Sequence, residues 1–253
     1  MPLDYGGVPE RLKADTGHSA IVLADTGAGP VFNRFVFDQA RKDIKINNLL
    51  YVVDSFVVLS SEWNEDRIAD RKLLRKTPLR ASTASLMLDY VVQEGVDPRG
   101  LLDYMTCFSK LNDPARFSAQ DWRGAENFDR RARPSRYVVQ QRIDYLYPQH
   151  DDPEIADRYL DALERLFRTA QAEGIRVLVL KMPLTDAFRK ALPDEPSFDQ
   201  ALKERITLLG IDYLDFSEVL PDASLYFDTD HLNRQGVSRF YDAYLRDALA
   251  PPD

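Results

Sequence analysis

The chain has 253 residues, of which 44% are hydrophobic and 29% charged, and its 33 basic and 41 acidic residues give a net charge of −8. The length suits one large α/β domain or two small ones, and the acidic balance argues against broad nucleic-acid binding, which needs a basic surface. The single cysteine, Cys107, excludes an intrachain disulfide and a cysteine-based zinc site. No stretch approaches the roughly 18 apolar residues of a membrane span, and the start lacks a signal-peptide pattern.

The first quarter of the chain predicts helix and strand in alternation. Pro9 suits the first turn of a helix that ends at Gly17. The short apolar run SAIVLA, residues 19–24, predicts a buried parallel strand followed by a glycine-rich turn. Residues 31–43 have helical spacing, and residues 48–54 are rich in β-branched and aromatic side chains, which predicts the next strand.

The regular alternation breaks down in the middle of the chain. Residues 81–95 and 98–111 each predict an amphipathic helix, because apolar residues recur at three- and four-residue steps. Residues 115–142 mix seven arginines with aromatic residues and show no clear period. We therefore expect residues 65–150 to form an insertion or cap within a single domain spanning 1–253, packed over the carboxyl edge of the sheet.

Alternation returns in the last hundred residues. Helices are predicted over 153–174, 197–210 and 237–249, separated by buried strands over 175–180 and 211–215. Strands and helices that alternate at both ends of a chain predict a three-layer α/β sandwich around a mostly parallel sheet.

The stretch DTDHL carries the clearest chemical signal. Asp228 precedes His231 by three residues, between the last strand and the last helix. A carboxylate there can accept the imidazole Nδ1–H and leave Nε2 free as a base. One alternative is a helix-start cluster, in which Asp228 or Asp230 satisfies backbone N–H groups and His231 is only packed. Another is a metal site, which we disfavour because three adjacent residues leave too few other ligands. We expect no metal and no cofactor.

This Asp-x-x-His-Leu sequence, placed between the last strand and last helix, resembles block V of the SGNH (GDSL-type) hydrolase superfamily. The bacterial cell-envelope members, including alginate O-acetyltransferase-like proteins, are the most similar in character. The resemblance covers 211–249 and extends to 17–59 and 153–183, but not to 65–150. It implies a flavodoxin-like sheet, with Asp228 as the orienting carboxylate and His231 as the general base.

The same resemblance implies an oxyanion hole built from two further blocks. Gly27 or Gly29 of ADTGAGP matches the block II glycine. Asn64 is nearest to the block III asparagine, although the glycine expected before it is missing. The alternative is that both glycines serve turn geometry and that Asn64 caps a turn.

The nucleophile of the family is missing, since neither Gly-Asp-Ser nor Gly-Ser-Ser occurs. In the family this block follows the first strand and precedes the first helix, which here begins near Val8. We therefore expect the strand and its serine upstream of Met1. A degenerate, non-catalytic relative is a second explanation, and use of Ser55, Ser60 or Ser61 is a third.

Two functions follow from the resemblance. The first is an SGNH-type ester hydrolase or O-acyltransferase acting on a small acyl ester or an acylated polysaccharide, in the cell envelope or periplasm if an anchor precedes the chain. The second is a catalytically inactive binding or scaffold protein. In either case we expect this chain to be soluble, without a nucleic-acid partner or membrane segment, and to show negligible esterase activity. At the site, Asp230 should point away from His231, Leu232 should be buried, and residues 1–6 should lie near His231.

Overall fold

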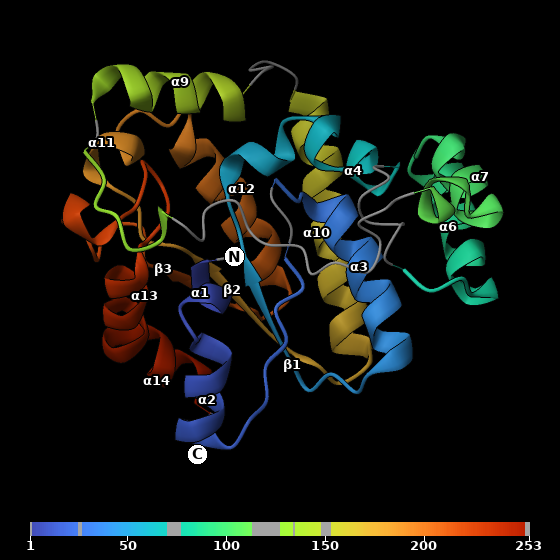
Figure 1. Ribbon diagram of the computed structural model, residues 1–253, viewed down its shortest axis with the longest axis horizontal. Coiled ribbons are helices and arrows are strands. Elements are labelled where there is room, and N and C mark those ends of the chain that lie inside the picture. The colour runs from blue at the N-terminus through green and yellow to red at the C-terminus, as the bar shows by residue number, and fades with distance from the viewer. Residues whose placement is uncertain are drawn as a thin grey trace.

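The computed structural model describes residues 2–24, 27–69, 77–112, 127–133, 135–147 and 153–250. Its sheet has three parallel strands in the order β1 (Asn48–Val52), β2 (Arg176–Lys181) and β3 (Asp212–Asp215) (Figure 1). Leu50 is paired with Leu178, and Leu180 is paired with Leu214. The protein is therefore of the α/β class, and three of the four predicted strands are confirmed.

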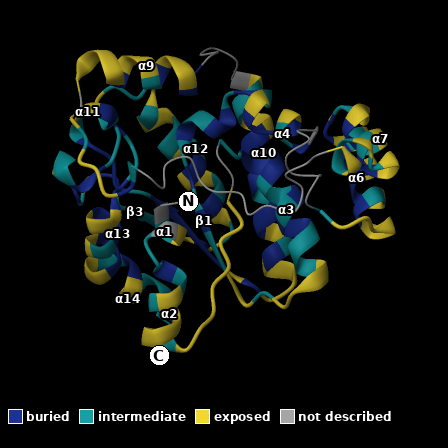
Figure 2. Cartoon of the chain, viewed as in Figure 1, coloured by how far each residue is buried: buried dark blue, intermediate teal, exposed yellow. Residues whose placement is uncertain are grey.

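The fourth prediction, a strand over residues 19–24, is wrong. This segment follows α2 without regular structure, and Ile21, Val22 and Leu23 are 65%, 36% and 47% exposed. Figure 2 shows it as a largely exposed connection. An apolar run becomes a buried strand only where a neighbouring strand takes up its N–H and C=O groups, and no such neighbour is present in the described part of the chain.

Helices cover both faces of the sheet. On one face, α3 (Pro30–Asp43), α10 (Pro153–Ala172) and α12 (Glu195–Leu208) pack against alternate strand residues. On the other face lie α2 (Val8–Thr16), α13 (Arg234–Phe240) and a π-helical turn over Tyr241–Leu245, which continues into α14 (Arg246–Leu249). The period of two along each strand separates the two cores: the first includes Tyr51, Val53, Val177 and Val179, and the second includes Leu50, Val52, Leu180 and Leu214.

Shorter elements connect these helices and strands. Two 3-10 turns, Ser55–Val58 and Ser61–Trp63, lead from β1 into α4 (Glu65–Ala69), and another, Ala223–Leu225, follows β3. The helix expected over 98–111 is two helices, α7 (Pro98–Thr106) and α8 (Phe108–Leu111), because Cys107 between them has a left-handed backbone with φ 55°. The remaining helices are α1 (Pro2–Tyr5), α6 (Ala81–Gln93), α9 (Arg136–Leu146) and α11 (Asp186–Arg189).

The middle of the chain occupies two separate places. The first part, α6 with α7 and α8, lies beside α3 and α4, away from the carboxyl ends of the strands (Figure 1). It shares the core of the first sheet face, since the Tyr90 ring packs edge-on against Phe35 at 5.1 Å. The second part, residues 127–133 and 135–147, contacts the loop that follows β3 through the Arg142–Asp230 ion pair and the Ala132–Tyr226 backbone bond. Most of the arginine-rich stretch 115–142 before α9 lies outside the described residues. None of the helices in the described ranges has the length and apolar character needed to cross a bilayer.

Candidate active site

The loop between β3 and α13 holds the Asp-His pair in a tight turn. The Asp228 carboxylate accepts the backbone N–H of Asp230 at 3.1 Å and that of His231 at 2.7 Å. Across the turn, the N–H of Phe227 donates to the carbonyl of His231 at 3.0 Å. Leu232 is buried, as predicted, with 1% exposure. The turn is therefore closed by its own polar groups and anchored by one apolar side chain, without any ligand.

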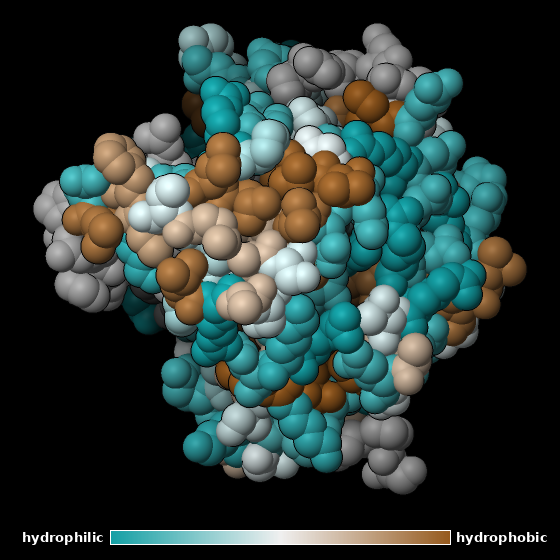
Figure 3. Space-filling model, turned by 90° about the vertical axis from the view of Figure 1, so that its right-hand side faces the viewer, coloured by the Kyte–Doolittle hydropathy of each residue, from teal (hydrophilic) through white to brown (hydrophobic). Residues whose placement is uncertain are grey.

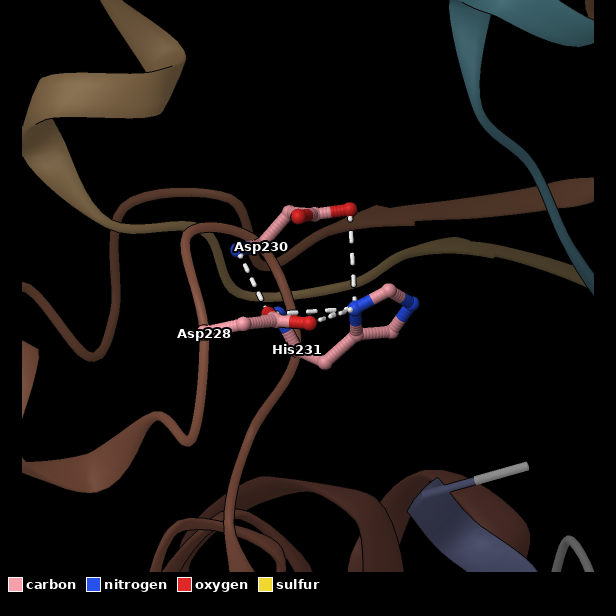
Figure 4. Close-up of side chains that lie close together, drawn as sticks. All are labelled: Asp228, Asp230 and His231. Atoms are coloured by element: carbon pink, nitrogen blue, oxygen red, sulfur yellow. Dashed lines mark hydrogen bonds and ion pairs between the residues drawn. The ribbon is translucent and has the colours of Figure 1, made fainter. Parts of the chain in front are cut away.

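The imidazole of His231 has one occupied and one open nitrogen. Its Nδ1 lies 2.9 Å from an Asp228 carboxylate oxygen, and its ring stacks on Phe227 at 5.5 Å. Figure 4 shows the other ring nitrogen pointing away from both aspartates. Within the described residues, Nε2 has no hydrogen-bond partner. A carboxylate on Nδ1 favours the tautomer with its proton there and leaves a lone pair on Nε2.

Asp230 does not point away, and this prediction is wrong. Its carboxylate lies 3.6 Å from His231 Nδ1. The guanidinium of Arg142, from α9, donates two hydrogen bonds to the same carboxylate, at 3.1 and 2.8 Å. The Thr229 hydroxyl donates a third at 2.7 Å. Two carboxylates therefore flank Nδ1, and one of them is held by a residue from the middle of the chain.

These charges set the protonation of the site. Burial lowers the pKa of His231, but the carboxylates of Asp230 and Asp228 outweigh it and bring the pKa above its usual 6.5. Burial works to raise the pKa of Asp230, yet His231 and Arg142 hold it below its usual range. His231 is thus a base that is more readily protonated than an isolated histidine.

Asp54 is a further ionisable group at this edge that sequence reasoning missed. It follows β1, whose last bond to β2 is donated by the N–H of Val53 to the Leu180 carbonyl. Burial raises the pKa of Asp54 to about 6; Asp230 adds to this shift, and His231 opposes it. Its carboxylate accepts no hydrogen bond in the described part of the chain. The available signal was its position, directly after a buried strand of a parallel sheet.

The three serines considered as alternative nucleophiles, Ser55, Ser60 and Ser61, already have hydrogen-bond partners. Ser55 is buried, with its Oγ 2.6 Å from the Tyr147 hydroxyl and 2.5 Å from a Glu195 carboxylate oxygen. Glu195 in turn forms an ion pair with Lys181, which is 3% exposed. The Ser60 hydroxyl accepts the Glu62 N–H, and the Ser61 hydroxyl donates to Asp66. Within the described residues, none of these serines is hydrogen-bonded to His231.

The three oxyanion candidates lie together, but their polar groups serve the fold. The Asn64 amide oxygen accepts the N–H of Val31, in the first turn of α3, and its Nδ2 donates to the carbonyls of residues 57 and 60. The N–H of Gly29 donates to the Trp63 carbonyl. A Cβ at Gly29 would lie 2.5 Å from Asn64 Oδ1, and one at Gly27 would lie 2.4 Å from the Trp63 ring. Close packing therefore accounts for both glycines, and neither Gly29 nor Asn64 offers a free N–H.

Residues 127–133 lie against the His231 loop through backbone contacts. The Asn233 side chain donates from Nδ2 to the carbonyls of Arg130 and Ser224, while its Oδ1 accepts the N–H of Gly236 and caps α13. The N–H of Ala132 donates to the Tyr226 carbonyl at 2.6 Å. These contacts join residues 127–133 to the loop and to the start of α13.

The start of the chain packs against the helix that follows the His231 loop; the expected approach of residues 1–6 to His231 itself stays a prediction. Helix α1 contacts α13, which begins three residues after His231. Leu3 packs against the cluster that contains Leu232, Val237 and Phe240. Figure 4 includes part of α1 in the view around the Asp-His pair. The first turn of the protein is thus a neighbour of α13, despite more than 200 residues of separation in sequence.

The side chains of Asp228, Asp230 and His231 lie close enough together to be considered as ligands of one metal ion. One ligand atom from each of Asp228, Asp230 and His231 can be chosen so that all lie within 4.8 Å of one another. However, Arg142 already neutralises Asp230, and a cation would compete with that guanidinium. The arrangement is that of a hydrogen-bonded base and its carboxylates.

In comparisons with known proteins, no family model and no curated protein matches the chain.

Proposed function

We propose that this chain supplies the general base and orienting carboxylate of an SGNH-type ester hydrolase or O-acyltransferase. The observation that carries the proposal is the His231–Asp228 pair at 2.9 Å with Nε2 open. In such a site Nε2 accepts the proton of an attacking serine hydroxyl and later returns it to the leaving group, while Asp228 stabilises the imidazolium. The substrate class is a small acyl ester or an acylated polysaccharide.

The nucleophile belongs, in this proposal, to a strand that pairs with the open edge of β1. The carbonyl of Asn47 and the N–H of Val53 face β2, so alternation directs the N–H and C=O groups of residues 48, 50 and 52 to the other side. No strand pairs there in the described part of the chain. A strand added at this edge would complete a flavodoxin-like, three-layer sandwich. Its carboxyl end, with a following serine, would then lie on the same edge as His231.

A catalytically inactive scaffold is the second candidate. It is favoured by the engaged amides of Gly29 and Asn64, which leave those groups unable to stabilise an oxyanion. The scaffold is also favoured because Ser55, Ser60 and Ser61 are hydrogen-bonded to groups other than His231. The two candidates differ in whether a serine can be brought to Nε2.

A titration of His231 tests the base half of the site without any substrate. In histidine-selective NMR, we expect a pKa above 6.5 for wild-type protein and a lower value in Asp228→Asn and in Asp230→Asn, because each change removes a neighbouring negative charge. If the pKa of His231 were the same in wild-type protein and in both variants, the electrostatic basis of the proposal would be lost.

An activity experiment separates the enzyme from the scaffold. We expect the 253-residue chain to show negligible hydrolysis of p-nitrophenyl acetate. A form extended at its start by a designed strand that ends in Gly-Asp-Ser should hydrolyse the ester and be labelled on that serine by a fluorophosphonate. His231→Ala should reduce turnover by about 10³- to 10⁴-fold. A Gly-Asp-Ala version is the matched control.

Two outcomes contradict this proposal. Robust turnover by the 253-residue chain that is lost in Ser55→Ala would assign the nucleophile to Ser55 instead. A correctly folded extended form with no serine labelling and no turnover would favour the scaffold.

A further inference from the structure

Helices α6, α7 and α8 carry large apolar side chains on their outer surface. Leu88 and Val92 of α6 are 52% and 75% exposed, Leu102 and Met105 of α7 are 63% and 54% exposed, and Phe108 of α8 is 69% exposed. We call these five residues the α6–α8 face. Figure 3, which views the side of the molecule where α6 and α7 lie, shows apolar atoms gathered into a continuous area.

Among the described residues, the core of the protein is packed without this face. The opposite side of α6 already supplies the core contacts, with Met87 and Tyr90 buried beside α3, and Tyr104 does the same for α7. A helix that is apolar on two sides is normally covered on both. The outer side of α6 is therefore built for a second contact.

The size of the face matches a protein interface. At roughly 100 Å² of exposed apolar surface per side chain, the five residues present on the order of 500 Å². A standard interface buries about 800 Å² per partner, of which about 60% is apolar. The apolar area available here is therefore close to that of a complete, stable contact.

Charge in this region permits a second copy of the same chain as the partner. Residues 77–112 contain three basic and four acidic residues, a net charge of −1, which matches the average charge density of the whole chain. A contact between two copies through this region therefore sets only a small net charge on each side against the other.

The outer stripe of α6 also complements itself. Ala81, Ser85, Leu88 and Val92 follow one another at helical steps, and all four are exposed. In an antiparallel pairing of two α6 helices about a two-fold axis, Ser85 faces Leu88 of the other copy, and Ala81 faces Val92. Small residues then meet large ones, as a self-complementary interface requires. We propose that the α6–α8 face pairs two copies of this chain into a symmetric dimer.

Sedimentation equilibrium over a protein concentration series tests the proposal. We expect a monomer–dimer equilibrium for the wild-type chain. Val92→Asp and Leu102→Asp should each weaken association about 100-fold or more, because each buries an unpaired charge in the interface. Leu208→Asp is the matched control: Leu208 is 83% exposed on α12, outside the face, and its substitution should leave association unchanged.

A second pair of variants tests the geometry of the pairing. Ser85→Leu should weaken the dimer because it sets a large side chain against Leu88, whereas Ser85→Ala should preserve it. Circular dichroism confirms that each variant is folded. A wild-type chain that stays monomeric at about 100 µM, a dimer that survives Val92→Asp and Leu102→Asp, or an open series of larger oligomers would each overturn the proposal.

Discussion

The two described parts of the middle of the chain both pack buried apolar side chains against the rest of the protein, but they differ in their further contacts. Residues 127–133 and 135–147 are joined to the His231 loop by the buried Phe128 ring and, in addition, by polar contacts that include the Arg142–Asp230 ion pair and the Ala132–Tyr226 backbone bond. The segment α6–α8 packs against α3 through apolar side chains and leaves a second apolar surface outside. Polar contacts fix direction, since each donor needs its own acceptor, whereas apolar contacts tolerate adjustment. The first part therefore suits a precise site, and the second suits association.

The largest difference between the two regions should appear when a methyl group is added to a glycine. In α13, directly below the His231 loop, a Cβ at Gly236 would lie 2.1 Å from the Leu225 carbonyl oxygen. At Gly95, just after α6, a Cβ meets nothing within 4 Å, although φ is +72°. We expect Gly236→Ala to lower the free energy of unfolding by about 3 kcal/mol and Gly95→Ala by about 1 kcal/mol. Urea unfolding measures both, and equal losses would contradict the contrast.

Ion pairs should show the next largest difference. Arg142→Ala leaves the Asp230 carboxylate, whose side chain is 10% exposed, without its guanidinium, and should lower the free energy of unfolding by about 2 kcal/mol. Arg99→Ala removes the Asp97 pair from α7, where the Arg99 side chain is 88% exposed, and should have no measurable effect. Thermal unfolding at neutral pH compares them. A loss for Arg99→Ala as large as that for Arg142→Ala would show that burial does not set the strength of these pairs.

A smaller effect, dependent on pH, is expected at Asp54. Its pKa is raised from 3.8 to about 6 in the folded protein, so the folded state favours the protonated form. The free energy of unfolding therefore loses a contribution as the pH rises from about 4 to about 6. Asp54→Asn should raise the free energy of unfolding by about 1–2 kcal/mol at pH 7.5 and change it little at pH 4. In the α6–α8 region the pKa of Asp97 is lowered, so Asp97→Asn should give no such gain. Denaturant unfolding at the two pH values checks both variants; a gain at pH 4 alone would reverse the assigned sign.

What could be predicted from sequence depended on the distance between partners. Asp228 and His231 are three residues apart, and their pairing follows from local spacing alone. Arg142 and Asp230 are 88 positions apart, so their pairing depends on tertiary structure that no local pattern contains. The raised pKa of Asp54 depends in the same way on tertiary structure, through its burial and through charges from several elements.

The same distinction explains the strands and one helix. Residues 48–52 and 19–24 are similar apolar runs, but only the first has β2 beside it. A β-strand forms only where a second strand pairs with it, and the sequence of one apolar run does not show whether that second strand is present. The helix over 98–111 had the right apolar spacing throughout. Its interruption at Cys107 is a single backbone angle, which hydrophobic periodicity does not report.

The side chain of Asn233 ties together stretches of chain that lie far apart in sequence. It donates to Arg130 and Ser224 and accepts from Gly236, so neither residues 127–133 nor the loop can leave without breaking bonds to this one amide. Segments linked in this way open as one cooperative unit. Local opening of the His231 loop and detachment of residues 127–133 are then a single event, which amide hydrogen exchange would report as one common opening free energy.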